Sequence, residues 1–106
     1  MFFELRQYIC RPGQRARWAQ FMDEVIIPYQ ISRGMVVIGS FVSEADDDLY
    51  FWIRRFDSEE QRERLYEAVY KDPEWLEGIA PQVGEMLDRE KIVVQRIVPT
   101  PRSVIR

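Results

Sequence analysis

The chain has 106 residues, of which 46% are hydrophobic and 31% charged, and its formal net charge is −3. This length predicts one domain with a single modest core, and the composition is typical of a soluble globular protein. No apolar run approaches the ~18 residues of a membrane span, and no basic segment followed by an apolar one resembles a secretory signal. Basic residues are spread along the chain, which disfavours nucleic acid as a partner. We therefore expect neither a membrane span nor a nucleic-acid ligand.

The sequence contains no histidine and one cysteine, Cys10. Without histidine the chain cannot build a Ser-His or Cys-His nucleophile, a histidine-ligated zinc site or a proximal haem histidine. Acid–base chemistry would have to use Asp, Glu, Tyr, Lys or an unusual arginine. Cys10 has no partner for an internal disulfide, which is consistent with a reducing compartment. We expect a cytoplasmic protein with no metal and no cofactor, in which Cys10 is an inert apolar residue.

Residues 2–10 open the chain as a strand whose two faces differ. Alternation places Phe3, Leu5 and Ile9 on one face and Glu4, Arg6 and Tyr8 on the other. Residues 13–27 then carry apolar side chains, including Trp18, at helical spacing. Pro28 is expected to end or bend this helix, because proline cannot continue the hydrogen-bond ladder.

A β-hairpin is predicted after the first helix. Residues 34–44 and 49–56 read as strands joined by a turn over residues 45–48. Asp57, with Glu60 three residues later, predicts the N-terminal cap of a second helix. The Asp-Pro pair at residues 72 and 73 predicts the start of a further short helix.

A broken helical pattern continues to Glu90, and residues 91–98 form a fourth predicted strand. The order is therefore β-α-β-β-α-β, an α+β ferredoxin-like arrangement. We expect a four-stranded antiparallel sheet with its helices on one face, forming one domain over residues 1–98. Prolines end the last strand, and residues 99–106 are expected to be an extended tail that lies along a partner subunit, covers a pocket or is disordered.

Three of the predicted strands are apolar on both faces. In the second strand, the two faces carry Met35, Val37 and Phe41 and, opposite them, Val36, Ile38 and Val42. One layer of helices covers only one face of a sheet, and a solvated face would alternate to polar residues. We therefore expect a homodimer in which a second copy buries the other face, sheet on sheet about a two-fold axis.

Two segments of the chain resemble the NIPSNAP family. FELRQYICRPG at residues 3–13 is similar to the family's opening pattern, Tyr-Glu-Leu-Arg-x-Tyr-x-x-x-Pro-Gly. YFWIRRFDSEEQRERL, followed by KDPEW, resembles the family's tryptophan strand, Asp-capped helix and downstream Trp. The chain departs from the pattern at Phe56, where the family has Tyr, and at the basic pair before it. The resemblance implies a dimeric α/β barrel, a group that includes cofactor-independent monooxygenases, haem-binding enzymes and lactone isomerases.

Glu4, Arg6 and Tyr8 match the family motif and share one strand face. In one interpretation they form the polar wall of a pocket, where Arg6 binds a carboxylate or enolate and Tyr8 or Glu4 moves a proton. In the other, which we favour, they form a buried ion pair that sets the strand register or the dimer seam.

Aromatic side chains offer a second candidate site. Five of them could line a pocket for a flat apolar ligand between helices and sheet: Trp18, Trp52, Trp75, Tyr66 and Tyr70. Packing of a small core is the simpler interpretation. Arg54 and Arg55 face opposite sides of their strand, so one approaches a buried face. That charge requires a partner such as Glu4 or Glu44, unless it binds an anion.

The leading hypothesis is a small homodimeric NIPSNAP-type domain that binds a small apolar or aromatic molecule between sheet and helices. One alternative is a cofactor-independent monooxygenase or isomerase acting on an electron-rich ring, with Arg6, Tyr8 and Glu4 as the working residues. Another is a protein-interaction module in which the charged helix face at residues 59–64 docks a partner. The sequence identifies neither the ligand nor a reaction.

Overall fold

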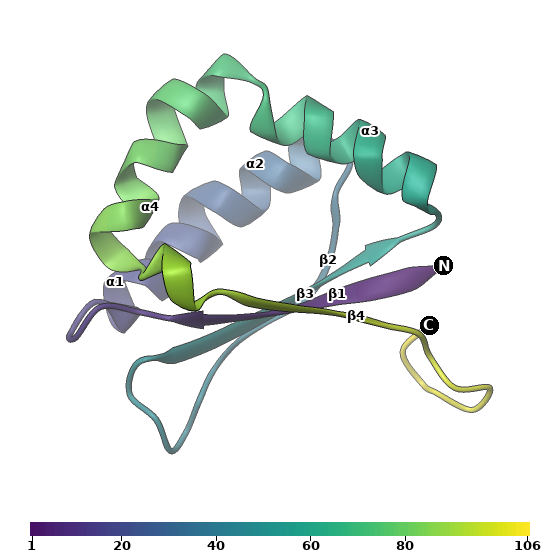
Figure 1. Ribbon diagram of the computed structural model, residues 1–106, viewed down its shortest axis with the longest axis horizontal. Coiled ribbons are helices and arrows are strands. Elements are labelled where there is room, and N and C mark those ends of the chain that lie inside the picture. The colour runs from purple at the N-terminus through teal and green to yellow at the C-terminus, as the bar shows by residue number, and fades with distance from the viewer.

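The computed structural model describes all residues from 1 to 106 as a sheet with helices on one of its faces (Figure 1). The strands are β1 (Phe2–Ile9), β2 (Val36–Val42), β3 (Leu49–Phe56) and β4 (Val93–Ile97). The helical segments are α1 (Arg15–Phe21), η1 (Met22–Ile26), α2 (Ile27–Ser32), α3 (Glu59–Tyr70), η2 (Glu74–Ile79), α4 (Ala80–Met86) and η3 (Arg89–Lys91).

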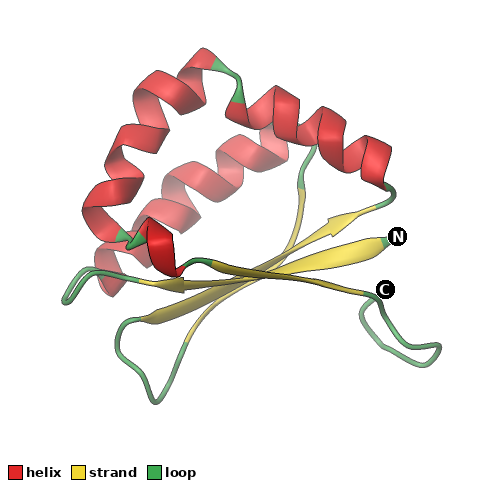
Figure 2. Ribbon diagram, in the orientation of Figure 1, coloured by secondary structure: helices red, strands yellow, loops and turns green.

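The strand order in the sheet is β2-β3-β1-β4, and every neighbouring pair is antiparallel. Figure 2 shows the helices together on one side of the sheet, with the C-terminal loop on the other. This is the ferredoxin-like arrangement, and it confirms the predicted α+β class. β2 begins at Val36 rather than at Gly34, because the chain turns at Gly34 with a φ of 101°, a conformation that favours glycine.

The first helix continues past Pro28, which corrects the prediction that it could end there. The segments α1, η1 and α2 follow one another without a break up to Ser32. In η1, a π-helical turn, the amide of Ile27 donates to the carbonyl of Met22, five residues back. Pro28 then occupies the first turn of α2, a position that tolerates its missing N–H.

A second proline is accommodated in the same way. The π-helical turn η2 ends with the amide of Ala80 donating to the carbonyl of Trp75, and Pro81 lies in the first turn of α4. π-helical turns inside α-helices are rare and are frequent at functional sites. Both of these turns lie over the helix-covered face of the sheet, where they contribute residues to the core.

The N-terminal cap of α3 is Ser58 and not Asp57 as predicted. The Ser58 hydroxyl accepts a hydrogen bond from the amide of Gln61 at 3.1 Å. Asp57 instead exchanges hydrogen bonds with the side chain of Gln61. Serine and aspartate are both strong N-cap residues, so two adjacent candidates cannot be ranked from sequence alone.

A β-bulge in β2 changes which side chains share a face. The register with β3 shifts between Val37 and Gly39, so that Ile38 is the extra residue. Phe41 consequently lies opposite Phe51 on the face away from the helices, not on the same face as Val37 as predicted. The Phe41 ring lies across Gly39, where an added Cβ would come within 2.6 Å of the ring.

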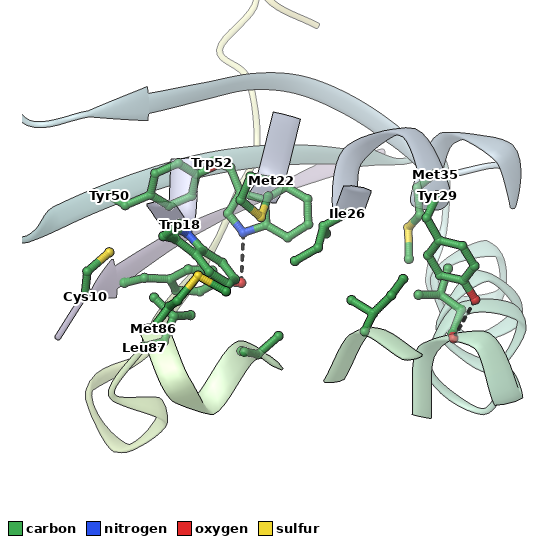
Figure 3. Packing of buried hydrophobic residues seen from close by; sticks show 14 of the residues in the cluster. Cys10, Trp18, Met22, Ile26, Tyr29, Met35, Tyr50, Trp52, Met86 and Leu87 are labelled. Atoms are coloured by element: carbon green, nitrogen blue, oxygen red, sulfur yellow. Dashed lines mark hydrogen bonds between the residues drawn. The ribbon is translucent and has the colours of Figure 1, made fainter. Parts of the chain in front are cut away.

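The helix-covered face of the sheet holds the core. Sixteen buried apolar residues form one cluster, and Figure 3 shows Trp18, Met22 and Trp52 near Met86 and Leu87. The opposite face, which we call the outer face, exposes four large apolar side chains, those of Val36, Phe41, Val93 and Ile97. No helix of the protein is both long and apolar enough to cross a lipid bilayer.

Candidate functional site

A cavity of about 130 Å³ lies between the sheet and the helices. Eleven of its thirteen lining residues are hydrophobic, and all three tryptophans of the chain are among them. The sheet contributes Arg6, Tyr8 and Trp52, and the first helix contributes Trp18, Met22, Ile26 and Gln30. The remaining lining residues are Tyr66, Tyr70, Trp75, Val83, Leu87 and Ile92. An apolar cavity with a few polar groups is typical of small-molecule sites.

Local structure explains why these side chains meet. Residues 6 and 8 of β1 point to the same face because side chains alternate along a strand. The two π-helical turns supply Met22 and Ile26 from η1 and Trp75 from η2. The cavity therefore lies under the places where both proline-containing helices depart from regular α-helix.

The hydroxyl of Tyr8 is the centre of a hydrogen-bonded wall of the cavity. It accepts a hydrogen bond from Arg6 Nε at 2.7 Å and another from Trp52 Nε1 at 2.8 Å. The Tyr8 ring also meets Trp18 edge to face, with ring centroids 5.9 Å apart. These contacts hold Arg6 and Tyr8 in fixed positions beside the cavity.

A buried ion cluster, centred on Glu4, lies next to this wall. Glu4 Oε1 accepts from Arg54 Nη2 at 2.8 Å and from the Tyr66 hydroxyl at 2.6 Å. Glu4 Oε2 accepts from Arg62 Nε at 2.7 Å. Arg6 Nη1 is further away, 3.8 Å from Oε1. The side chains of Glu4 and Arg54 are 1% and 0% exposed, so this ion pair is fully removed from water.

Arg54 uses its other terminal nitrogen to bind residues of the cavity wall. Arg54 Nη1 donates to Gln30 Oε1 at 2.9 Å and to the Tyr70 hydroxyl at 2.7 Å. Gln30 Nε2 donates to the same Tyr70 hydroxyl at 3.1 Å. Arg54 thus connects the ion cluster to the lining of the cavity. Its carboxylate partner is Glu4, one of the two partners, Glu4 and Glu44, that were expected from sequence.

The protonation states in the ion cluster follow from these contacts. Burial alone would raise the pKa of Glu4, but hydrogen bonds from Tyr66 and Arg62 and the charge of Arg54 hold that pKa below its usual 4.5. Burial raises the pKa of Tyr66 to about 12, so its hydroxyl keeps the proton that it donates to Glu4. At neutral pH Glu4 is therefore an ionised acceptor and Tyr66 a neutral donor.

Six of the eight ligand-binding candidates from sequence line the cavity: Arg6, Tyr8, Trp18, Trp52, Tyr66 and Trp75. The other two, Glu4 and Arg54, form the ion cluster behind its wall. For Glu4, Arg6 and Tyr8 of β1, the sequence left two interpretations open, a pocket wall and a buried ion pair, and each applies to different residues of the three. Glu4 is in a buried ion pair, whereas Arg6 and Tyr8 form a polar wall.

Two polar residues of the cavity and the ion cluster were not among the candidates identified from sequence. Gln30 lies beyond Pro28, where the helix was predicted to end, and Arg62 was grouped with an exposed helix face. Arg62 lies four residues before Tyr66 on α3, which puts both side chains on one helix face. That spacing of four residues was the sequence signal that could have placed Arg62 beside Tyr66. Of the helix face at residues 59–64, positions 59, 60, 63 and 64 are exposed.

Cys10 and the acidic residues offer no further site. The Cys10 side chain is buried, and burial raises the pKa of its thiol to about 11, so the thiolate is scarce at neutral pH. No group of three or more His, Cys, Asp or Glu residues is placed to hold a metal ion.

The family model described as NIPSNAP matches residues 3–103 of the chain. The chain belongs to the NIPSNAP family. This confirms the resemblance seen in the opening strand and in the segment around Trp52. No curated protein matches the chain.

Solved structures of NIPSNAP proteins are similar to this one. Protein Atu4242 of Agrobacterium tumefaciens is 22% identical, with a TM-score of 0.89 over 100% of both chains. A NIPSNAP family protein of the same bacterium, Atu5224, is 21% identical, with a TM-score of 0.87 over 99% of this chain and 98% of that chain. An uncharacterised NIPSNAP-like domain protein of Burkholderia xenovorans is 22% identical, with a TM-score of 0.85 over 96% and 87%. These likenesses show the fold.

Proposed function

We propose that this NIPSNAP protein binds a small apolar or aromatic molecule in the cavity between sheet and helices. The observation that carries the proposal is the cavity of about 130 Å³, whose lining includes all three tryptophans. An apolar cavity of about 150 Å³ in another protein holds benzene, so this volume suits a single six-membered ring. Arg6, Tyr66 and Trp75 are only partly buried, which leaves the cavity accessible from the surface.

NMR of the tryptophan indole N–H groups tests this proposal. Titration with toluene or benzyl alcohol is expected to shift the indole signals of Trp18 and Trp52 in a saturable manner. Val83→Phe, which fills part of the cavity, should abolish the shifts. Ile31→Phe, at a helix position that is 53% exposed, is the matched control and should bind as the wild type does. Wild-type protein whose indole signals do not move would contradict the proposal.

A homodimer through the outer face is the second part of the proposal. Its support is the set of exposed apolar side chains on that face, carried by its two edge strands β2 and β4, because exposed apolar surface of this kind is a liability in a solvated monomer. Residues 99–106 form a tail outside the domain of residues 1–98. The tail lies against the outer face, where it and Phe3 line a further cavity of about 320 Å³. We propose that the tail extends the dimer interface, and that the dimer is cytoplasmic, as its single buried cysteine favours.

Sedimentation or native mass spectrometry tests the dimer. Wild-type protein is expected at twice the chain mass, and Phe41→Glu should give the single-chain mass because it places a charge among the exposed apolar side chains of the outer face, on the edge strand β2. Leu76→Glu is a matched control, since Leu76 is 54% exposed on the helical side of the molecule. A wild-type protein at the single-chain mass would contradict this part of the proposal.

A cofactor-independent monooxygenase or isomerase is a second candidate, favoured by one observation. Arg6 and Tyr8 both line the cavity, and Arg6 Nε donates a hydrogen bond to the Tyr8 hydroxyl at 2.7 Å. A cation and a hydroxyl placed in this way could stabilise an enolate formed by an electron-rich ring. Glu4 does not line the cavity, and both its oxygens accept hydrogen bonds within the ion cluster. Oxygen uptake with a quinol substrate, lost in Tyr8→Phe, would support this candidate, and the absence of turnover across a panel of quinols would count against it.

A further inference from the structure

The polar atoms around the cavity are almost entirely hydrogen-bond donors. No carboxylate lines it, and the amide oxygen of Gln30 already accepts a hydrogen bond from Arg54. A ligand in this cavity therefore meets a surplus of N–H and O–H groups. Buried donors without acceptors are costly, so the surplus indicates what the cavity is built to receive.

Two tyrosine hydroxyls keep a hydrogen that no protein group accepts. The Tyr8 hydroxyl accepts hydrogen bonds from Arg6 and Trp52, and neither of these donor groups can accept one in return. The Tyr70 hydroxyl likewise accepts from Arg54 and from the amide nitrogen of Gln30. Both tyrosines line the cavity, so their remaining hydrogens are free to bind a ligand.

Two nitrogens of residues that line the cavity are also without a protein acceptor. Arg6 uses Nε for Tyr8 and Nη1 for a long contact of 3.4 Å to Tyr66, whereas its Nη2 donates to no protein atom. The indole nitrogen of Trp18 is buried and has no hydrogen-bond partner, although Trp18 lines the cavity. Both residues line the cavity, but the Trp18 nitrogen itself is covered by protein atoms, so Arg6 Nη2 is the nitrogen donor that a ligand can reach.

The charges around Glu4 also favour an anionic ligand, because arginines outnumber carboxylates there. Glu4 contacts three arginines, at positions 6, 54 and 62. The second carboxylate, Glu59, contacts Arg62 and also pairs with Arg96. Four guanidinium groups thus face two carboxylates, and one of the four, that of Arg6, lines the cavity.

We propose that the ligand is an anion: a single-ring molecule with a carboxylate or a similar oxyanion. Its ring packs among the tryptophans, and its oxygens accept hydrogen bonds from Arg6 Nη2 and from the hydroxyls of Tyr8 and Tyr70. The proposal rests on the proposed function, because it specifies the ligand of that same cavity. It adds that recognition depends on charge and not only on apolar packing.

Matched single-ring probes test this without altering the protein. Tryptophan fluorescence is titrated with sodium benzoate, benzamide and benzylamine, which share a ring but carry an anion, a neutral amide and a cation. Benzoate is expected to bind about tenfold or more tighter than benzamide, the effect of one charge-assisted hydrogen-bonded contact, and benzylamine should bind weakest. Equal binding of benzamide and benzoate overturns the anion preference and leaves the proposed function intact. Failure of all three, together with toluene, overturns both.

Substitutions then assign the preference to named groups. Arg6→Gln should remove most of the tenfold preference for benzoate while leaving the affinity for benzamide within about twofold. Tyr70→Phe should weaken benzoate by a smaller factor. Arg64→Gln, a loss of an exposed arginine on α3, is the matched control and should keep the full preference. A preference that survives in Arg6→Gln and Tyr70→Phe would overturn the assignment.

Discussion

Two neighbouring regions on the helix-covered face of the sheet differ in how their polar groups are used. In the ion cluster, both oxygens of Glu4 accept hydrogen bonds, and the two terminal nitrogens of Arg54 donate to four oxygens, so that only the buried Nε of Arg54 has no partner. On the cavity wall, two and four residues further along β1, Arg6 and Tyr8 retain donors without a protein acceptor. Both regions contain an arginine and tyrosines, so residue type does not distinguish them.

The difference separates a structural role from a binding role. A buried charge whose partners are all within the protein stabilises one arrangement of the chain, because removing any partner leaves the others unpaired. A donor left unpaired beside a cavity does little for the fold and is available to a ligand. The comparison predicts that substitutions in the ion cluster cost stability, whereas those on the cavity wall change binding.

The largest effect is expected for Glu4→Gln. This change leaves Arg54 buried without its counter-charge, and it should lower the free energy of unfolding by about 3–5 kcal/mol. Urea unfolding measures the loss. Glu85→Gln, which breaks an exposed pair with Arg17, is the control and should cost less than about 1 kcal/mol. Equal losses in the two variants would refute the structural role of Glu4.

The pH dependence of stability tests the same residue in the unaltered protein. Because the pKa of Glu4 is lower in the folded state than its usual 4.5, its contribution is complete above that value. The contribution is lost as the pH falls through the folded pKa. The stability difference between wild type and Glu4→Gln should be constant at neutral pH and shrink in acid, as measured by urea unfolding at several pH values. A difference that grows in acid would contradict the direction of the pKa shift.

The smallest loss of stability is expected for Arg6→Gln. Its side chain is 17% exposed and lies 3.8 Å from the nearest Glu4 oxygen, and the Tyr8 hydroxyl keeps the hydrogen bond from Trp52. The free energy of unfolding should therefore change by less than about 1 kcal/mol. Arg54→Gln, measured in the same way, should cost several times as much. Similar losses in the two variants would mean that Arg6 belongs to the ion cluster.

The fold was predictable because its signals are local. Alternation along β1 and β3, the hairpin turn and the proline positions specify strands and helices within short windows of sequence. The errors are also local: the bulge at Ile38, the N-cap at Ser58 and the helix that continues past Pro28. Ser58 and Asp57 are adjacent strong capping residues, and neither a bulge nor a proline within the first turn of a continuing helix carries a sequence signal that separates it from its alternative.

The sequence by itself determined the family, the class of fold and the shared face of Glu4, Arg6 and Tyr8, because a strand has a period of two residues. Only the tertiary structure decided which of these three is structural and which faces a cavity. That outcome depends on what the helices place opposite each residue: Arg62 and Tyr66 over Glu4, 58 and 62 residues away in the chain, and the π-helical turns over Tyr8. A hydrogen bond between such distant residues is not encoded in any local pattern, so the division between ion cluster and cavity wall exists only once the helices lie on the sheet.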